Sequence, residues 1–167
     1  MNGMSNGHKI EAWGDGVCEP VNPGGHAAWG IRICVDGKVV HSAGGYVGCS
    51  KEMSNNVAEY SAFCALARWV RASDLKGILT VRMDSKLVIM QLSGKWKVNG
   101  GYYYPYYLEA RELLKELRGI LGGVELIWIP RGENSECDVY SKKVLLDRGI
   151  RFRIQPEPPV NKSVQGE

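Results

Sequence analysis

Residues 54–72 read SNNVAEYSAFCALARWVRA, and the hydrophobic pattern of the chain changes its period here. The segment opens with Ser54, Asn55 and Asn56, three residues of the types that cap helix N-termini. Few helix-breaking residues follow, which favours a helix over 57–72. The other strands and helices can be placed outward from this helix.

Upstream of this helix, apolar and polar residues alternate, as is typical of β-strands. The predicted strands cover residues 9–15, 27–35 and 38–47. Asp36-Gly37 separates the second strand from the third, and this dipeptide favours the tight turn of a β-hairpin. A turn-rich stretch over 16–25 follows the first strand, so we expect Asp15 to end that strand.

Downstream of the helix, short apolar runs alternate with helical segments. The predicted elements are a strand over 78–83, helices over 86–92 and 105–121, a strand over 124–129 and a final helix over 135–147. Three antiparallel strands followed by βα alternation indicate an α/β fold, with one mixed sheet and helices on both of its faces. We expect one domain over 9–153, a flexible tail over 1–8 and an irregular tail over 154–167.

Composition narrows the class of protein. The chain has 167 residues, enough for one compact domain, and its 21 basic and 18 acidic residues leave a net charge of +3. This balance excludes a polybasic protein, so an anionic partner must be met by a local patch. No apolar stretch is long enough to span a membrane, and the N-terminus does not resemble a signal peptide. The five cysteines form no CxxC pair, which indicates a reducing compartment, and we expect a cytoplasmic protein.

Glu59 lies where a carboxylate is not expected. It shares the i, i+3, i+4 and i+7 spacing of one helical face with Ala62, Phe63 and Leu66, and that face is otherwise apolar. A charged group that points toward a core needs a partner that compensates its charge. Glu59 is therefore a candidate functional residue.

Three further acids are predicted at the ends of elements. Asp15 and Asp84 each end a predicted strand, and Asp138 lies in the first turns of the last helix. Taken singly, they have structural explanations as a turn residue, a helix cap and a complement to a helix dipole. However, ligands of open sheets gather at the carboxyl ends of strands, and clustered carboxylates are stabilised by a divalent cation such as Mg²⁺ or Mn²⁺. Together the acids are candidates for a metal site that performs phosphoryl transfer.

Several short motifs resemble those of one family. They are Asp15-Gly16, Asn22-Pro23-Gly24, Ser54 to Tyr60, Asp84 to Val88 and Pro130 to Asp138. In this order, and on these predicted elements, they are similar to the motifs of type 1 ribonuclease H over residues 9–151. The resemblance implies a five-stranded mixed sheet flanked by helices. It also implies cleavage of the RNA strand of RNA–DNA hybrids with two Mg²⁺ ions, leaving 3′-hydroxyl and 5′-phosphate ends.

The resemblance implies roles for individual residues. The catalytic, metal-binding residues would be Asp15, Glu59, Asp84 and Asp138. Asp15 would bridge both ions, Glu59 and Asp84 would support one of them, and Asp138 the other. This role would explain the carboxylate of Glu59 on an apolar helix face. Mn²⁺ could replace Mg²⁺, and since no protein partner is evident besides the RNA–DNA hybrid, we expect a monomer.

Residues matched to the family's substrate-contacting segments form two groups. The first lies after the first strand and at the start of the long helix: Asn22, Ser54, Asn55 and Asn56. The second lies between the second and third helices: Lys95, Trp96 and Lys97. Amide side chains suit contacts to 2′-hydroxyl groups, and lysines suit contacts to phosphates. Asn55 and Asn56 also have a purely structural interpretation as helix caps.

The chain departs from the common family pattern in two places. Many bacterial members carry a His in the loop before the last helix; residues 129–138 contain none, and Arg131 and Glu133 are the candidates to assist there. The chain also lacks the basic protrusion that many members insert between the second and third helices. Five tyrosines follow Gly101 instead, which we interpret as packing the loop onto its helix. A basic stretch over 142–153 either replaces the grip of the protrusion or is a solvated face.

Two alternatives stay open. One is a nuclease of the same superfamily with broader duplex specificity, which would act on double-stranded RNA or RNA–DNA junctions. The other is a non-catalytic module that keeps the fold and binds hybrids. Members of the second kind lose one or more of the carboxylates, whereas all four positions are filled here.

Overall fold

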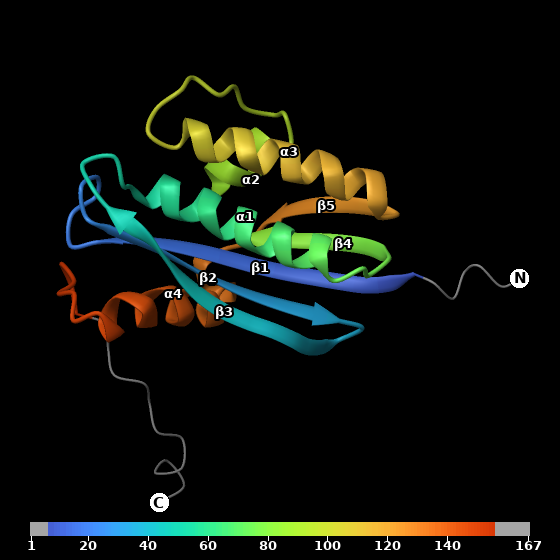
Figure 1. Cartoon of the computed structure of the whole chain (residues 1–167), viewed down its shortest axis with the longest axis horizontal. Helices are drawn as coiled ribbons and strands as arrows, with labels where there is room; N and C mark the ends of the chain where they lie inside the picture. Colours follow the sequence, from blue (N-terminus) through green and yellow to red (C-terminus); the bar gives the residue numbers. More distant parts are fainter. Residues whose placement is uncertain (1–6, 156–167) are drawn as a thin grey trace, which may run out of the picture.

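The computed structural model describes residues 7–155 and contains a five-stranded sheet (Figure 1). Its strands are β1 (His8–Glu19), β2 (His26–Val35), β3 (Lys38–Cys49), β4 (Gly77–Met83) and β5 (Gly123–Trp128). They lie in the order β3-β2-β1-β4-β5; β1, β2 and β3 pair antiparallel, and β4 and β5 continue the sheet in parallel. The predicted α/β fold with a mixed sheet is confirmed.

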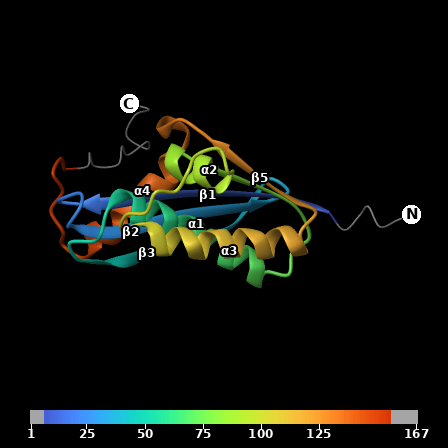
Figure 2. The same ribbon diagram turned by 90° about the horizontal axis from the view of Figure 1, so that it is seen from above.

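Four helices flank the sheet. They are α1 (Asn55–Ala72), α2 (Lys86–Leu92), α3 (Tyr104–Ile120) and α4 (Ser135–Asp147), with a short 3₁₀ turn over Arg131–Glu133. α1 and α3 lie on one face of the sheet and α4 on the other (Figures 1 and 2). None of the helices in residues 7–155 is long and apolar enough to cross a bilayer. The tails predicted over 1–8 and 154–167 fall largely outside the described residues, and His8 already belongs to β1.

The prediction that Asp15 ends the first strand is wrong. β1 continues to Glu19, because its second half pairs with β2 as far as Glu19↔His26. The parallel pairing of β1 with β4, in contrast, stops at Gly14↔Met83. Asp15 therefore lies where the parallel part of the sheet ends, which is the place where ligands collect in α/β folds.

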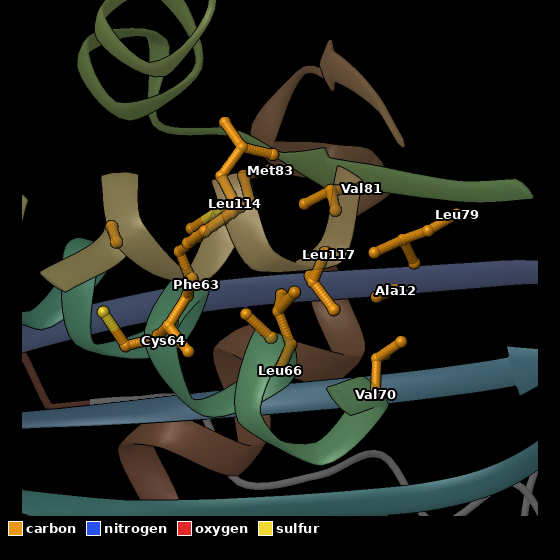
Figure 3. Close-up of a cluster of buried hydrophobic side chains, with 14 of the residues drawn as sticks. Ala12, Phe63, Cys64, Leu66, Val70, Leu79, Val81, Met83, Leu114 and Leu117 are labelled. Atoms are coloured by element: carbon orange, nitrogen blue, oxygen red, sulfur yellow. The ribbon is translucent and has the colours of Figure 1, made fainter. Parts of the chain in front are cut away.

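The main core lies between the sheet and the helices on its α1 side. Phe63 and Leu66 of α1 are fully buried there, and they pack with Leu114 and Leu117 of α3 and with strand side chains (Figure 3). Burying a side chain of this size stabilises a fold by about 1.5–3 kcal/mol. The helical face that carries Glu59 is thus a core face, as its spacing predicted.

Gly30 allows α4 to pack directly on β2. A Cβ at this position would lie 2.4 Å from the Cys137 carbonyl oxygen and 2.8 Å from the Ser141 nitrogen. Both atoms belong to the helix backbone, so any side chain at Gly30 would push the helix away from the sheet. Since Gly30 pairs with Asp15 in the sheet register, this contact brings Asp138, next to Cys137, toward Asp15.

Candidate active site

Three carboxylates meet where the parallel pairing of β1 with β4 ends. Asp15 belongs to β1, Asp84 directly follows β4, and Glu59 lies early in α1. One oxygen of each carboxylate lies within 4.8 Å of the other two. The site is poorly accessible, since Asp15 is 5% exposed and the Asp84 side chain 7%. The structure thus brings together three of the four acids singled out from the sequence.

Gly16 lets β1 approach the start of α1. A Cβ on Gly16 would lie 2.4 Å from the Ala58 carbonyl carbon and 2.5 Å from the Glu59 nitrogen. No side-chain rotation could relieve a contact with backbone atoms. Gly16 also donates its N–H to Asp15 Oδ1 at 3.0 Å. The Asp-Gly pair therefore places one carboxylate directly beside the helix that carries another.

Burial and mutual repulsion disfavour the charged forms of the carboxyl groups in this cluster. Burial, followed by the negative charges of Asp84 and Asp138, raises the pKa of Asp15 to about 8. Burial also raises the pKa of Glu59 well above its ordinary value, with Asp15 and Asp84 adding to the effect. In addition, Glu59 Oε2 is buried and has no hydrogen-bond partner among residues 7–155. A divalent cation would compensate these charges and supply the missing partner, so the donor set fits a hard metal ion with oxygen ligands.

Asp138 lies at the edge of the same site, in the first turn of α4. It lines a cavity of about 500 Å³ together with Asp15 and Glu59. Its carboxylate does not belong to the tight cluster of three, and it forms an ion pair with Lys142, whose Nζ lies 2.9 Å from Asp138 Oδ2. The fourth acid therefore faces the same cavity but has a positive partner of its own.

Asn134 is a site residue that sequence analysis missed. Asn134 occupies the N-cap position of α4 but makes no capping hydrogen bond with its side chain. Its buried amide donates to the Gly14 carbonyl at 2.8 Å and to Asp84 Oδ1 at 3.3 Å. The indole N–H of Trp128 holds the Asp84 carbonyl oxygen at 3.1 Å. Asp84 is thus oriented by two side chains whose sequence positions give no signal of this role.

Replacing Asn134 by alanine should weaken metal binding by about 10- to 100-fold, the usual effect of removing a residue that orients a metal ligand. The free energy of unfolding should also fall by about 1–3 kcal/mol, because the Gly14 carbonyl loses its buried donor. Calorimetric titration with Mn²⁺ and thermal unfolding would measure the two effects. Val139→Ala, an exposed change on the same helix, is the control. Unaltered metal affinity in a destabilised Asn134→Ala protein would mean that Asn134 only supports the fold.

The first group of predicted substrate contacts lies at the N-terminus of α1. The Asn55 N–H donates to Asn22 Oδ1 at 2.9 Å, which ties the loop after β1 to the helix. Ser54 is the residue that caps α1, by accepting the Val57 N–H at 3.2 Å. Asn55 lines the cavity of the carboxylates, and Asn56 is exposed. The capping interpretation therefore holds for Ser54 rather than for Asn55 and Asn56.

The second group lies apart from the carboxylates. Lys95, Trp96 and Lys97 are exposed on the loop between α2 and α3, and they do not line the acidic cavity. Of the two residues proposed to assist in place of His, Arg131 lines the cavity, with its Nε 3.8 Å from Asp84 Oδ2. Glu133 is exposed and outside the cavity lining.

The basic stretch over 142–153 does not act as one surface. Lys142 and Arg153 line the acidic cavity, and Arg153 also donates to Glu19 Oε2 and to the Cys18 carbonyl, both at 2.9 Å. Arg148 instead packs over the ring of Tyr46, 3.5 Å from its centroid. The two ends of the stretch thus contribute positive charge to the cavity, while its middle packs against β3.

Comparisons with known proteins place this chain in one family. Residues 14–144 match the family described as "Reverse transcriptase-like". A ribonuclease HI of Halobacterium salinarum is 30% identical over 141 residues, which are 84% of this chain and 66% of that protein. A bifunctional protein of Mycobacterium tuberculosis is 37% identical over 86 residues, 51% of this chain. The match covers only 22% of the length of that mycobacterial relative.

Solved structures agree with the sequence relatives. The RNase H1 of Halobacterium salinarum superposes with a TM-score of 0.71 at 29% identity, over 83% of this chain and 98% of that one. LC11-RNase H1, solved in complex with an RNA/DNA hybrid, gives a TM-score of 0.70 at 26% identity, over 80% of this chain and 94% of that one. The chain belongs to the reverse transcriptase-like family, and within that family to the type 1 ribonucleases H. The family and the acidic cluster together support binding of a divalent metal ion.

Proposed function

We propose that this chain is an endoribonuclease that hydrolyses the RNA strand of RNA–DNA hybrids, leaving 3′-hydroxyl and 5′-phosphate ends. The observation that carries the proposal is the buried cluster of Asp15, Glu59 and Asp84, in which Glu59 Oε2 lacks a partner among the described residues. Burying several carboxylates together costs free energy unless a cation compensates their charge. A divalent cation held there can assist phosphodiester hydrolysis. The similarity to a ribonuclease HI, and to an RNase H1 solved with a hybrid, supports this substrate.

We assign the metal-binding roles as the resemblance implies. Asp15 would contact both of two Mg²⁺ ions, Glu59 and Asp84 would hold one, and Asp138 the other. When bound, such ions would supply an activated water and stabilise the leaving oxygen of a phosphodiester. The ligands are all carboxylate oxygens, a set that suits Mg²⁺ and equally Mn²⁺.

The chain's own residues would bind and orient the substrate. Lys142 and Arg131 line the cavity and would meet phosphate oxygens of the RNA strand. Asn55, which lines the same cavity, would contact a 2′-hydroxyl group, with Asn22 held beside it. Arg131 is also our candidate for the assisting role of the absent loop His. Its place in the cavity lining supports it over Glu133.

We further propose that the active unit is the domain over 9–153 acting as a cytoplasmic monomer. Five unpaired cysteines support a reducing compartment. The hybrid's DNA strand would lie toward Ser54, Asn56 and the loop that carries Lys95, Trp96 and Lys97. All of that loop's basic side chains are exposed.

The test is cleavage of end-labelled RNA–DNA, RNA–RNA and DNA–DNA duplexes, each with Mg²⁺, with Mn²⁺ and with EDTA. We expect loss of only the RNA strand of the hybrid, and only with a metal ion. Cleavage of RNA–RNA as well would favour the nuclease of broader specificity. Retention of the hybrid without cleavage in either metal would overturn the proposal in favour of a non-catalytic binding module.

A further inference from the structure

A buried polar network lies beside the acidic site without belonging to it. Its members are Tyr60 in α1, Gln91 in the last turn of α2, and Tyr103 at the start of α3. Tyr60 directly follows the carboxylate Glu59 and is fully buried, and Gln91 is only 4% exposed. None of the three is within the cavity of the carboxylates.

Gln91 is the centre of this network. The Tyr60 hydroxyl donates to Gln91 Oε1 at 2.6 Å. Gln91 Nε2 donates in turn to the Tyr103 hydroxyl at 2.9 Å and to the Lys97 carbonyl at 3.2 Å. Both N–H groups of the amide and its carbonyl are therefore paired. The rings of Tyr60 and Tyr103 also stack, with their centroids 5.6 Å apart.

The network fastens the loop that carries the exposed basic residues. Gln91 holds the loop at Lys97 and, through Tyr103, at its end. The start of the loop is fixed separately, because the N–H groups of Lys95 and Trp96 donate to the Met90 carbonyl at 2.9 and 3.1 Å. Within residues 7–155, neither Lys95 nor Lys97 makes an ion pair. Both ammonium groups therefore extend from a loop that Met90 fixes at its start and that Gln91 fixes at Lys97 and, through Tyr103, at its end.

Burying the amide of Gln91 costs more free energy than burying an apolar side chain of the same size. A leucine would occupy a similar volume without needing three hydrogen bonds, and burying an amide costs free energy unless all of its groups are paired. What the amide adds is direction, since each hydrogen bond fixes one partner at a defined place. Here the partners are the helix that carries Glu59 and the loop that carries the lysines.

We propose that Gln91 is a positioning residue for hybrid binding. Through Tyr60 and Tyr103 it fixes the distance between the metal-binding carboxylates and the loop of Lys95, Trp96 and Lys97. This inference rests on the proposed function, because it takes that loop to contact the strand of the hybrid that is not cleaved. It also gives Tyr103, one of the five tyrosines after Gly101, a role in function as well as in packing.

Gln91→Leu should raise KM for a long hybrid by about tenfold, the scale set by losing directed hydrogen bonds. The value of kcat at saturation should stay unchanged, because the carboxylates keep their positions. A hybrid too short to reach the loop should be cleaved equally by both proteins. Tyr102→Phe, which removes an exposed hydroxyl next to Tyr103, is the matched control and should leave KM unchanged.

A double variant separates positioning from general destabilisation. Lys95→Gln with Lys97→Gln should raise KM and reduce the slope of log affinity against log salt by roughly 1–2, as expected for two lost phosphate contacts. In that background Gln91→Leu should raise KM no further, because its effect acts through the two lysines. Thermal unfolding is measured in parallel, since Gln91→Leu leaves the Tyr60 hydroxyl unpaired and lowers stability in any case.

The outcomes distinguish this inference from the proposed function. If Gln91→Leu lowers the melting temperature but leaves KM and the salt slope unchanged, or if its effect adds to that of the lysine changes, the inference is wrong and cleavage stands. If the wild-type protein cleaves no hybrid, the proposed function fails. Binding of a fluorescent hybrid in EDTA then still tests the inference, with dissociation constants in place of KM.

Discussion

Asp84→Asn is expected to reduce hybrid cleavage by roughly 1,000-fold or more, equivalent to about 4 kcal/mol of transition-state stabilisation, while hybrid binding persists. Asparagine keeps the shape of the side chain but removes one of the three clustered charges. A divalent ion held by the remaining two carboxylates would be weakly bound and poorly oriented. Single-turnover cleavage in Mg²⁺ and fluorescence anisotropy with a labelled hybrid in EDTA would measure the two properties separately.

Asp36→Asn is the matched control for this change. Asp36 is an exposed acid in the turn between β2 and β3, where it pairs with His8. Asparagine tolerates the positive φ of 50° at this position, so the turn should be retained. We expect wild-type cleavage from Asp36→Asn. Full activity of Asp84→Asn would contradict the assignment of Asp84 to the metal site.

Asp15→Asn is expected to stabilise the metal-free protein at pH 8, with a melting temperature higher by roughly 4 °C or more. The pKa of Asp15 is raised by burial and by Asp84 and Asp138 to about 8, from an ordinary value of 3.8. Between these two values the folded protein keeps a proton that the unfolded chain has lost. The stability of the metal-free wild-type protein should therefore fall as the pH rises through this window. Asparagine does not titrate, so the variant should show a flatter profile.

The same pair of proteins also tests metal binding. Excess Mn²⁺ should stabilise the wild-type protein increasingly as the pH approaches 8, because the carboxyl group must lose its proton to bind the ion. Asp15→Asn should lose most of this stabilisation. Thermal unfolding followed by circular dichroism from pH 5 to 9, in EDTA and in Mn²⁺, would check both expectations. Parallel pH profiles for the two proteins in EDTA would contradict the raised pKa, and an unstabilised wild-type protein in Mn²⁺ would contradict the metal site.

Most of the fold could be predicted because local signals agree with it. Asp36-Gly37 predicts a hairpin, and both residues adopt the positive φ angles, 50° and 84°, that such a turn requires. The error at Asp15 has a physical cause. Asp-Gly was interpreted as the start of a turn, but pairing with β2 keeps the chain extended to Glu19. Tertiary hydrogen bonds, which a single strand does not reveal, outweighed the local preference.

The site could be predicted where a residue conflicts with its surroundings or lies at the end of a predicted element, as Asp15 and Asp84 do. Glu59 is an acid on an apolar helix face, so the conflict is visible from helical spacing alone. Asn134 and Gln91 conflict with nothing nearby, and their partners lie far away in the chain. Asn134 contacts the Gly14 carbonyl 120 positions away, and Gln91 contacts Tyr60 across 31. Such pairings follow from topology and cannot be obtained from one sequence without the fold.

The tyrosines after Gly101 illustrate the same limit. We interpreted them as packing the loop onto its helix; the rings of Tyr103 and Tyr107 instead contact Tyr60 of α1. Tyr102 and Tyr104 are exposed instead. Composition predicted an aromatic cluster, but only the direction of each side chain divides it into buried and exposed members.

Gly16 and Gly30 would have to be transplanted with this acidic site into any other scaffold. They carry no chemistry, yet each lies against helix backbone, at Glu59 in one case and at Cys137 in the other. A single methyl group at either position would widen the spacing between carboxylates that must share an ion. Rebuilding this site in another protein therefore requires the four acids and also glycine at the two positions where a strand lies against a helix backbone.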